Sequence, residues 1–350
     1  MPVTALDAPS RLAGVDLARG LAVLGMLAAH LIALPDLVWG DPTTWLALAD
    51  GRSSILFATL AGVSLGIVTG GAKPVPAAEL VTAGKRIAVR AVILLVIGIL
   101  LIATGVPVYV ILPAYALLFL LSLPLLPLRA RTLWIVAGAT ALVMPWVQPL
   151  LQAPEVWETA AGNDLALLIG WHYPFTVWFA FLAAGLAAAR SDLRRTRTQV
   201  RLVVAGGAAA LLAYAADAVR LPDGGDEYLQ AVWTAAPHSS GLLEAVGSGG
   251  WALLTLGVCL LLCRTAVRWV VYPLRAVGSM PLTVYVGQLV AWAIIAAVVL
   301  GDTGDLDGFR ALELFWPFVL TSLVACTAWA LLVGRGPLEA GIAAVTSRIR

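Results

Sequence analysis

The chain has 350 residues, of which 61% are apolar and 12% are charged, and its mean hydropathy is +0.94. Soluble globular domains carry about 25% charged residues, so this composition excludes a soluble enzyme. The balance of 22 Lys and Arg against 20 Asp and Glu gives no clustered basic face for nucleic acid, and the high hydrophobicity excludes a disordered chain.

The chain contains about ten apolar stretches that are each long enough for a helix to cross the hydrocarbon layer of a membrane. Their connections are too short for a separate soluble domain, and the stretches exceed the alternating ~10-residue segments of outer-membrane barrels. The sequence therefore predicts an all-α polytopic membrane protein, with residues 1–350 in a single transmembrane bundle. The predicted spans lie near 17–35, 53–70, 87–104, 107–125, 132–150, 166–189, 202–217, 247–263, 279–300 and 312–333, between a lead of residues 1–16 and a tail of residues 334–350.

Charged residues divide between the two sides of this predicted bundle. Almost all Lys and Arg fall on the side of the two chain ends, and only Arg52, Arg220 and Arg310 fall on the other side, together with most loop acids. Because positive charge stays in the cytoplasm, both termini are expected to be cytoplasmic and the chain to be a multi-pass protein of the cell membrane. The charged lead lacks a small-residue cleavage site, so we expect the first span to be an uncleaved anchor.

Asp16 and Arg19 lie one helical turn apart at the cytoplasmic mouth of the first span. They could simply pair with each other, with Arg19 also serving as a topology charge. Alternatively, Arg19 could bind the phosphates of a nucleotide-bearing cosubstrate that arrives from the cytosol. The spacing alone leaves both interpretations open.

The three histidines of the chain are all expected on the outer side of the bundle. His30 lies about three turns beyond Arg19, about 16 Å higher at ~1.5 Å per residue, and therefore in the outer half of the bilayer. His172 opens the sixth span, and His238 ends the acidic loop before the eighth. A histidine near the interface can be a simple polar anchor, which is the stronger interpretation for His172. For His30, deeper among apolar residues, proton transfer is the stronger interpretation, because imidazole exchanges a proton near neutral pH.

Polar residues at two further places are candidates for binding a substrate. Arg52 lies at the outer start of the second span, where it could pair with Asp50 or bind a polar or anionic acceptor. Tyr285 and Gln288 share one face of the ninth span. Gln288 lies within an apolar run and must find a partner or line a cavity.

Two sets of small residues are interpreted as packing residues. Ser54, Ala58, Gly62 and Gly66 form a four-residue ladder on the second span, which lets a neighbouring helix approach closely. The cysteines have no metal-ligand spacing, so we expect neither a disulfide nor a metal site from Cys259, Cys263 and Cys326.

Four segments carry a resemblance to a known family. They are residues 11–26 (RLAGVDLARGLAVLGM), 56–65 (LFATLAGVSL), 277–285 (VGSMPLTVY) and 334–339 (GRGPLE). The first resembles the opening of the YeiB-like membrane proteins and of their relatives around heparan-alpha-glucosaminide N-acetyltransferase, the transmembrane acyltransferase superfamily. The other three resemble later parts of the YeiB-like branch, so that the resemblance covers most of the chain.

The resemblance implies a membrane enzyme that moves an acyl group, such as acetyl, from cytosolic acyl-CoA to an acceptor at the outer side of the membrane. The implied acceptor is a carbohydrate-type molecule or another hydroxyl or amine compound. Asp16, Arg19 and Gly20 match the first motif of the family, which places them at the CoA side.

The resemblance leaves the catalytic base open. The lysosomal relative has its catalytic histidine in the loop after the first span, whereas residues 36–50 of this chain contain none. His30 stands where relatives carry Asn or His. Either His30 has taken the role, or His238 or His172 supplies the base from another span, or this branch has lost the activity.

The leading hypothesis is acyl transfer with His30 as the general base or as a transient acyl carrier. Arg52 with Gln288 or Tyr285 would hold the acceptor or the developing oxyanion. This hypothesis predicts a cavity that reaches from Arg19 toward His30 and is shared by another histidine.

Two other classes of function compete with this hypothesis. One is a transporter or flippase for a lipid-linked or glycan precursor, without covalent chemistry, although no internal repeat or pair of broken midplane helices supports it. The other is a scaffold whose polar residues only hold helices together. The sequence also leaves open a homodimer, and it leaves residues 337–349 as either a short interfacial helix or a lid.

Overall fold

The structure is a computed structural model that describes the chain except for residues 1–4, 10, 36, 39, 220–224 and 350. Arg220, which the charge analysis assigned to the outer side, lies outside these described residues. Helices are the only regular secondary structure of the described part, as the sequence predicts. In chain order they are η1 (Ala5–Asp7), α1 (Ala13–Leu31), η2 (Pro42–Ala49), α2 (Arg52–Val68), α3 (Ala77–Ile102), α4 (Leu112–Leu121), η3 (Leu123–Leu125), α5 (Ala130–Gln152), η4 (Glu155–Glu158), α6 (Ala160–Ile169), α7 (Phe175–Arg190), α8 (Thr196–Ala218), α9 (Glu227–Val232), α10 (Leu242–Leu262), α11 (Val267–Val270), α12 (Tyr272–Ser279), α13 (Pro281–Ile295), η5 (Ala296–Leu300), α14 (Leu306–Ala311), α15 (Phe315–Leu332) and α16 (Pro337–Ser347).

Six helical segments of the described chain are long and apolar enough to cross a membrane, or seven if the bent pair of η2 and α2 is one span. These six are α1, α5, α8, α10, α13 with η5, and α15. Each predicted span overlaps a helix, but α4 and α7 are shorter than a full span, and α3 carries the charged residues Lys85, Arg86 and Arg90. The chain is therefore a multi-pass membrane protein, and the count of about ten spans stays a prediction.

Some predicted spans differ from the helices in their bounds. The predicted span 166–189 is interrupted, because α6 ends at Gly170, which has a φ of +66°, and α7 starts only after Pro174. A left-handed φ favours glycine and ends a helix, and proline lacks the N–H that a continuing helix needs. His172 consequently lies in a turn between two helices and not inside a span.

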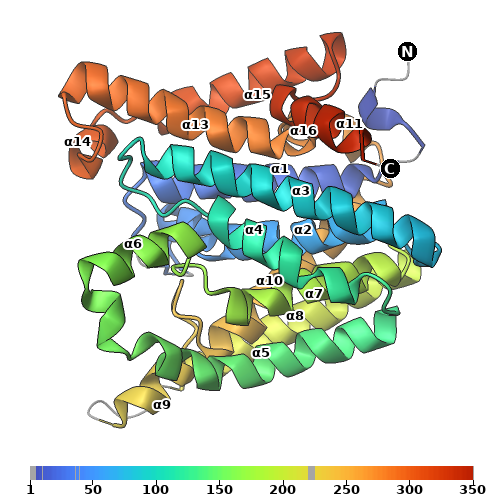
Figure 1. Cartoon of the computed structure of the whole chain (residues 1–350), viewed down its shortest axis with the longest axis horizontal. Coiled ribbons are helices and arrows are strands. Elements are labelled where there is room, and N and C mark those ends of the chain that lie inside the picture. Colours follow the sequence, from blue (N-terminus) through green and yellow to red (C-terminus); the bar gives the residue numbers. More distant parts are fainter. Residues whose placement is uncertain (1–4, 10, 36, 39, 220–224, 350) are drawn as a thin grey trace.

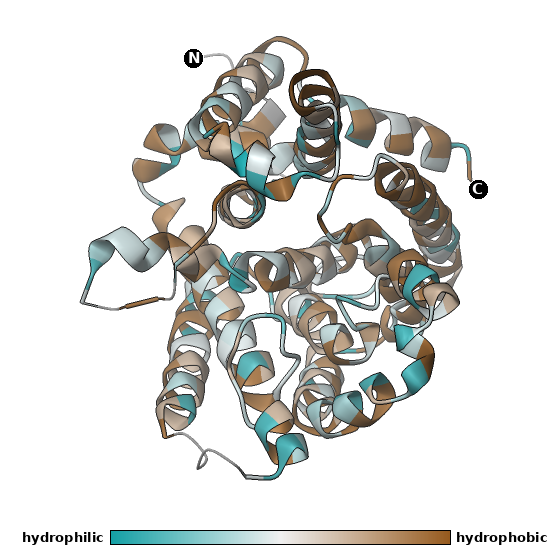
Figure 2. Cartoon of the chain, turned by 90° about the vertical axis from the view of Figure 1, so that its left-hand side faces the viewer, coloured by the Kyte–Doolittle hydropathy of each residue, from teal (hydrophilic) through white to brown (hydrophobic). Residues whose placement is uncertain are grey.

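The long helices run side by side along the longest axis of the molecule (Figure 1). In this view α13, α15 and α16 form one side, α1 to α4 lie in the middle, and α5, α7, α8 and α10 form the other side. Viewed from one end, most of the helical ribbon carries the white to brown colours of intermediate and hydrophobic residues (Figure 2). Large apolar side chains face outward, such as Leu211 at 71% and Leu332 at 84% exposed, which is the surface that lipid would cover.

The two ends of the bundle are occupied by different elements. Figure 1 shows α6, α9 and α14 at one end, and η1 and α16 at the other. The first end, where α1 finishes with His30, is called the histidine end below. The second end, where α1 begins near Arg11 and Asp16, is called the arginine end. The start and the finish of the described chain therefore lie at the same end of the bundle.

Small residues allow α2 and α7 to pack closely, as the predicted ladder indicates. A Cβ atom added at Gly62 would overlap the carbonyl oxygen of Leu182, and one added at Gly185 would overlap the carbonyl oxygen of Thr59. Close approach of two backbones at small residues is the common basis of helix pairing in membranes. The contact fixes α2, which begins beside the histidine end, against α7.

Arg190 ties three parts of the arginine end together. Its guanidinium donates hydrogen bonds to the carbonyl oxygens of Gly66, Gly71 and Leu126 and to the hydroxyl of Thr69, at 2.7–2.9 Å. The side chain is only 4% exposed. Since an unpaired buried carbonyl is costly, this arginine satisfies groups that the ends of α2 and η3 leave open.

Candidate active site

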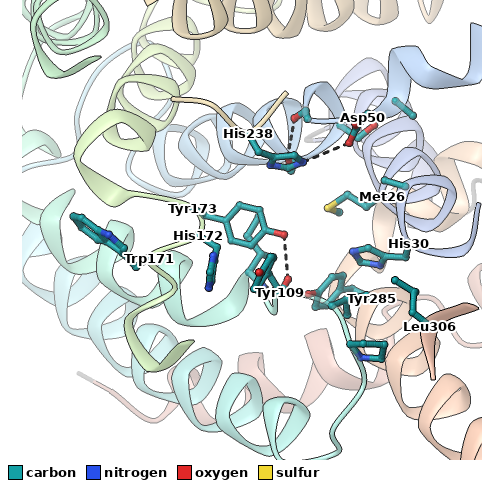
Figure 3. A pocket seen from close by; sticks show the side chains of 18 of the residues that line it. Met26, His30, Asp50, Tyr109, Trp171, His172, Tyr173, His238, Tyr285 and Leu306 are labelled. Atoms are coloured by element: carbon teal, nitrogen blue, oxygen red, sulfur yellow. Dashed lines mark hydrogen bonds and ion pairs between the residues drawn. The ribbon is translucent and has the colours of Figure 1, made fainter. Parts of the chain in front are cut away.

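A cavity of about 590 Å³ lies at the histidine end (Figure 3). It brings together all three histidines of the chain, which come from the last turn of α1, from the turn between α6 and α7, and from the loop before α10. We call it the histidine cavity. Its polar and aromatic lining residues are His30, Asp50, Ser53, Ser54, Tyr109, Gln152, Trp157, Trp171, His172, Tyr173, His238, Tyr285 and Arg310.

His238 is held by two carboxylates. Its Nε2 lies 3.5 Å from Oδ1 of Asp50 (Figure 3). Its backbone N–H donates to Glu244 at 2.6 Å, and the N–H of Ser240 donates to the same carboxylate at 2.6 Å. His238 and Ser240 both have a positive φ, of 62° and 60°, which is unfavourable for residues with a Cβ. Glu244 therefore stabilises a strained loop that aims His238 into the cavity.

The same carboxylates set the protonation of His238. Partial desolvation lowers the pKa of His238, but the hydrogen bond to Asp50 and the charges of Glu244 and Asp50 outweigh it, so the pKa is raised above 6.5. Because Nε2 faces Asp50, Nδ1 is the ring nitrogen that can exchange a proton with a substrate. An imidazole oriented by a carboxylate in this way is suited to act as a general base.

Gly51 makes the contact between Asp50 and His238 possible. It has a φ of 63° and a ψ of −46°, and the N–H of Arg52 turns back to the carbonyl oxygen of Asp50. A Cβ at Gly51 would lie 3.1 Å from Cβ of Pro237, the residue before His238. Only glycine adopts this tight turn and also lets the two loops approach so closely.

His30 lies in the same cavity with different partners. Its Nδ1 is 2.9 Å from Nε2 of Gln288 on α13. Arg310 of α14 donates to the carbonyl oxygens of His30 and Ala29, at 3.3 and 3.4 Å. A cation at the C-terminus of a helix is favourable because the last carbonyls carry partial negative charge. The contact also places a guanidinium in the cavity beside His30.

Aromatic rings form one wall of the histidine cavity. Tyr109 and His172 stack with ring centroids 3.5 Å apart, and Trp157 stacks on Trp171 at 5.0 Å. The hydroxyl of Tyr173 donates to the carbonyl oxygen of Tyr109 at 3.0 Å (Figure 3). Nε2 of His172 and Nε1 of Trp171 are buried and have no hydrogen-bond partner among the described residues. Buried polar atoms without a partner are uncommon, and here they offer unused bonds to a ligand.

A second cavity, of about 630 Å³, opens toward the arginine end. Five arginines line it against a single carboxylate, that of Glu339, so its lining is strongly basic. We call it the arginine cavity, and its five arginines are Arg11, Arg19, Arg86, Arg90 and Arg335. Guanidinium groups in such a cluster bind phosphate groups well, because they offer several charged donors in a fixed geometry.

Asp16 organises the mouth of the arginine cavity. Its carboxylate binds Arg11 at 2.8 Å and Arg19 at 3.3 Å, so the predicted pairing of Asp16 with Arg19 is present. Arg19 also donates to Ser64 at 2.9 Å and to the carbonyl oxygen of Gly278 at 3.1 Å. Gly20, on the same turn, packs directly against the backbone of α12, where a Cβ would overlap Leu274.

The C-terminal helix α16 forms part of the wall of the arginine cavity. Its Glu339 accepts hydrogen bonds from the backbone N–H groups of Leu282 and Thr283, at 2.8 and 3.2 Å, and from the hydroxyl of Thr283. A carboxylate at this position satisfies the open N–H groups of the first turn of α13. Residues 337–347 therefore form a helix that lines the cavity, and the choice between an interfacial helix and a lid stays open.

The inner part of the arginine cavity is aromatic. Phe57 and Phe119 contact the ring of Tyr115 edge-on, with centroids at 5.5 and 6.3 Å. The guanidinium of Arg90 lies 5.8 Å from the centre of the Phe119 ring. The Tyr115 hydroxyl is buried and has no partner among the described residues. This cavity therefore combines a basic mouth with an apolar throat that contains one unused hydroxyl.

Tyr285 lines both cavities. Figure 3 labels it in the wall of the histidine cavity. It is 3% exposed, and its hydroxyl accepts a hydrogen bond from the N–H of Ile111 at 3.3 Å. Two consecutive residues also separate the cavities: Ile111 borders the histidine cavity, and Leu112 borders the arginine cavity.

The structure groups most of the residues singled out in the sequence. His30, His172, His238 and Tyr285 share one cavity, and Gln288 reaches it through His30. Arg19 lines the other cavity. Arg52 belongs to neither lining, because its Nε donates to the hydroxyl of Tyr214 at 2.8 Å.

Three charged residues at the histidine end were not singled out as site residues in the sequence: Asp50 and Arg310, which line the cavity, and Glu244, which binds the backbone of His238. Glu244 lies just before the predicted span 247–263 and in the first turn of α10, and an acid so close to an apolar span could have been suspected to need a partner. Arg310 could have been found as one of few basic residues on its side of the membrane. Among the described residues, no three His, Cys, Asp or Glu side chains are grouped to hold a metal ion.

Two family models match the chain. The first, heparan-alpha-glucosaminide N-acetyltransferase, catalytic, matches residues 11–217, more than half of the chain. The second, DUF418, described as a protein of unknown function, matches residues 187–348. His30 and His172 lie in the first region, and His238 and Tyr285 lie in the second, so both regions contribute to the histidine cavity. A search of the curated proteins gives no match.

Proposed function

We propose that this chain, which belongs to the heparan-alpha-glucosaminide N-acetyltransferase catalytic family and its YeiB-like relatives, transfers an acyl group from acyl-CoA to a hydroxyl or amine acceptor. One observation carries the proposal. Three histidines from distant parts of the chain line one cavity, and Tyr285 is shared between that cavity and a second one lined by five arginines.

The arginine cavity suits the acyl donor. Its basic mouth, built around Arg11 and Arg19, offers charged partners for the phosphates of CoA. Its aromatic part suits the uncharged arm that carries the thioester, and the unused hydroxyl of Tyr115 could bond to an amide of that arm. The excess of positive charge in the loops on this side supports a cytoplasmic arginine end, the side on which acyl-CoA is available.

The histidine cavity suits the acceptor. Flat aromatic faces such as Tyr109 and Trp171 can stack on the apolar face of a sugar ring, and the unused nitrogens of His172 and Trp171 can bond to its hydroxyl groups. A carbohydrate-type acceptor at the outer side of the cell membrane is therefore the class that fits this cavity.

In the proposed reaction, His238 takes a proton from the acceptor while the acceptor oxygen or nitrogen attacks the carbonyl carbon of the thioester. The carbonyl oxygen becomes negative, and Arg310 and the hydroxyl of Tyr285 donate hydrogen bonds to it. The carbon–sulfur bond then breaks, the acyl group stays on the acceptor, and the proton on His238 passes to the leaving thiolate. His30, oriented by Gln288, is the second candidate for the base.

The experiment measures thioester cleavage by the full chain in lipid nanodiscs, with acetyl-CoA as acyl donor and glucosamine as the probe acceptor. Release of the CoA thiol and formation of acetylated glucosamine are followed together. His238→Gln is expected to lower the rate about 10²- to 10⁴-fold if it removes the general base. Arg19→Gln is expected to raise the acetyl-CoA concentration needed for half-maximal rate, because it removes a phosphate partner.

Two exposed residues provide matched controls, namely Glu227→Gln at the histidine end and Arg197→Gln at the arginine end. Both are expected to keep the activity of the unmodified protein. Full activity in His238→Gln with loss in His30→Gln would move the role of the base to His30. No thiol release in the unmodified protein with any hydroxyl or amine acceptor would contradict the proposal.

A further inference from the structure

The two cavities adjoin at Tyr285, which lines both of them. Ile111, which borders the histidine cavity, and Leu112, which borders the arginine cavity, follow each other at the start of α4. Tyr285 is only 3% exposed, so its ring fills the space between the cavity of about 590 Å³ and the cavity of about 630 Å³.

The Tyr285 ring is packed in the buried core, but among the described residues a single hydrogen bond fixes its hydroxyl. This bond, from the N–H of Ile111, is long at 3.3 Å. The ring is tilted by 59° to that of His30, with the two centroids 6.4 Å apart. A close-packed side chain rotates only where there is space for it to enter, and the two adjoining cavities provide that space.

The proposed function requires the two cavities to communicate, since the acyl group arrives in one and the acceptor binds in the other. Arg19 and His30 are about 16 Å apart along α1, so one small substrate cannot touch both. A permanently open path would expose the thioester to water and would join the two sides of the membrane.

We propose that Tyr285 is a gate between the arginine cavity and the histidine cavity, and that the structure represents its closed position. Rotation of the side chain away from Ile111 breaks one hydrogen bond and joins the two voids without a shift of the helices. The arm of the acyl donor then passes the ring, and the ring closes the path again when the arm leaves. The proposal rests on the proposed function only for the identity of the molecule that passes.

The test measures access to a single cysteine and requires no acyl transfer. The three native cysteines are replaced by alanine, and Ala29→Cys introduces a reporter beside His30 in the wall of the histidine cavity. A charged, membrane-impermeant methanethiosulfonate reagent is applied separately to either face of oriented membrane vesicles. Arg197→Cys and Asp302→Cys, exposed at the arginine end and the histidine end, identify which face the reagent reaches.

With Tyr285 in place, we expect the reporter to react from the histidine end and not from the arginine end. Tyr285→Ala is expected to raise the labelling rate from the arginine end at least tenfold. Tyr285→Phe keeps the ring but loses the hydrogen bond to Ile111, so a smaller increase is expected. Leu289→Ala, a buried neighbour on α13 that lines neither cavity, is the matched control and is expected to change nothing.

Labelling from the histidine end reports whether each variant is folded, and Tyr285→Leu replaces Tyr285→Ala if the latter fails this check. Equal labelling from the arginine end with and without the Tyr285 ring would overturn the gate. Rapid labelling of the reporter from both faces in the protein that retains Tyr285 would overturn it as well. Because no outcome depends on thioester cleavage, an inactive protein can still show the gate, and an active protein can lack it.

Discussion

Among the individual residues, the three histidines of the histidine end differ in the groups that they contact. His238 faces the carboxylate of Asp50, His30 faces the amide of Gln288, and His172 stacks on Tyr109. A carboxylate partner favours the protonated imidazole, whereas an amide or a ring does so much less. The three side chains are therefore chemically distinct although they share one cavity.

The pH dependence of the reaction tests the role of His238. Asp50 and Glu244 raise the pKa of His238 above 6.5 in spite of burial, so the neutral base forms only at higher pH. We expect the rate of thiol release to rise with pH through an inflection above 6.5. In Asp50→Asn the negative charge is lost, so the inflection is expected at a lower pH than in the unmodified protein.

The pH profiles are compared at saturating acetyl-CoA, so that changes in substrate binding do not affect the measured rate.

The raised pKa of His238 also predicts how the stability of the fold depends on pH. Stability is expected to fall as the pH rises, whereas the rate is expected to increase, because the raised pKa belongs to the folded state. The contribution of protonated His238 to stability is complete below 6.5 and is lost as the pH rises through its folded pKa. Identical pH profiles for Asp50→Asn and the unmodified protein would show that His238 is not the base.

A substitution at Gly51 tests whether the contact between Asp50 and His238 needs the tight turn. Gly51→Ala introduces a Cβ about 3.1 Å from Pro237 at a positive φ, so the two loops must separate. We expect activity to fall and the pH inflection to move toward that of Asp50→Asn. Gly71→Ala also has a positive φ, of 64°, but meets nothing within 4 Å, and it controls for backbone strain alone.

The sequence predicted part of this residue-level picture. The sequence predicted that the three histidines lie on one side of the bundle. The side of a loop follows from the order of the membrane spans, and this order can be read from the sequence. The partners of His238 were not predicted, because Asp50 and Glu244 lie far from each other in sequence and meet only through the packing of α2 and α10. Arg52 was considered as a partner of Asp50 or as a substrate-binding residue, and its hydrogen bond to Tyr214 was not predicted because it depends on a tertiary contact with α8.

At the scale of helices, the close contact of α2 with α7 is the packing feature with the sharpest consequence. Gly185→Ala places a methyl group against the carbonyl oxygen of Thr59, so the two helices must move apart. Overpacking of this kind costs about 1–3 kcal/mol. We expect a lower unfolding temperature in detergent, measured by tryptophan fluorescence or by loss of the monodisperse peak.

Gly138→Ala is the control on α5. A Cβ at Gly138 meets nothing within 4 Å, so the substitution is expected to be neutral or to stabilise the helix by up to about 1 kcal/mol. If Gly185→Ala were as stable as Gly138→Ala, α2 and α7 would not be packed as tightly as described.

Helix bounds follow the sequence where composition alone decides them. The predicted span near 279–300 coincides closely with the helical segment Pro281–Leu300, and the ladder of small residues on α2 meets α7 as expected. The break between α6 and α7 was not predicted, because the apolar run of the sixth span continues through it. Gly170 and Pro174 were the local signals for that break.

At the scale of the whole molecule, Arg190 joins segments that are far apart in the chain. Arg190→Ala would leave three carbonyl oxygens and one hydroxyl without their common partner. Since hydrogen bonds to a charged group contribute about 1.5–3 kcal/mol, we expect a loss of at least about 2 kcal/mol of stability. Thermal unfolding of Arg197→Ala, an exposed arginine at the same end, provides the comparison and is expected to be unchanged.

The orientation of the bundle is predicted from its loop charges and can be tested directly. Reporters fused to the N-terminus and to the C-terminus are both expected in the cytoplasm, because Lys and Arg concentrate at the arginine end. A cysteine at Asp302, exposed at the histidine end, is expected to react with an impermeant reagent added to intact cells. Reaction only after the cells are opened would invert the orientation.

The class of fold was predictable from composition, and the presence of two cavities was not. Hydropathy shows where helices cross the membrane, but a cavity forms where side chains fail to fill the space between helices, and that depends on all the neighbours at once. Arg86 and Arg90 illustrate the difference, because they count as topology charges in the sequence and line a cavity in the structure.

Because α16 is attached through Glu339 after the last predicted span, insertion into the bilayer and completion of the arginine cavity depend on different parts of the chain. A premature stop codon after Gly334 would leave every predicted span intact, and the shortened product would still insert into the bilayer. It would lack the part of the cavity wall that α16 supplies, together with the carboxylate that binds Leu282 and Thr283. Truncated versions of this protein should therefore be made in normal amounts in the cell and yet handle acyl-CoA poorly.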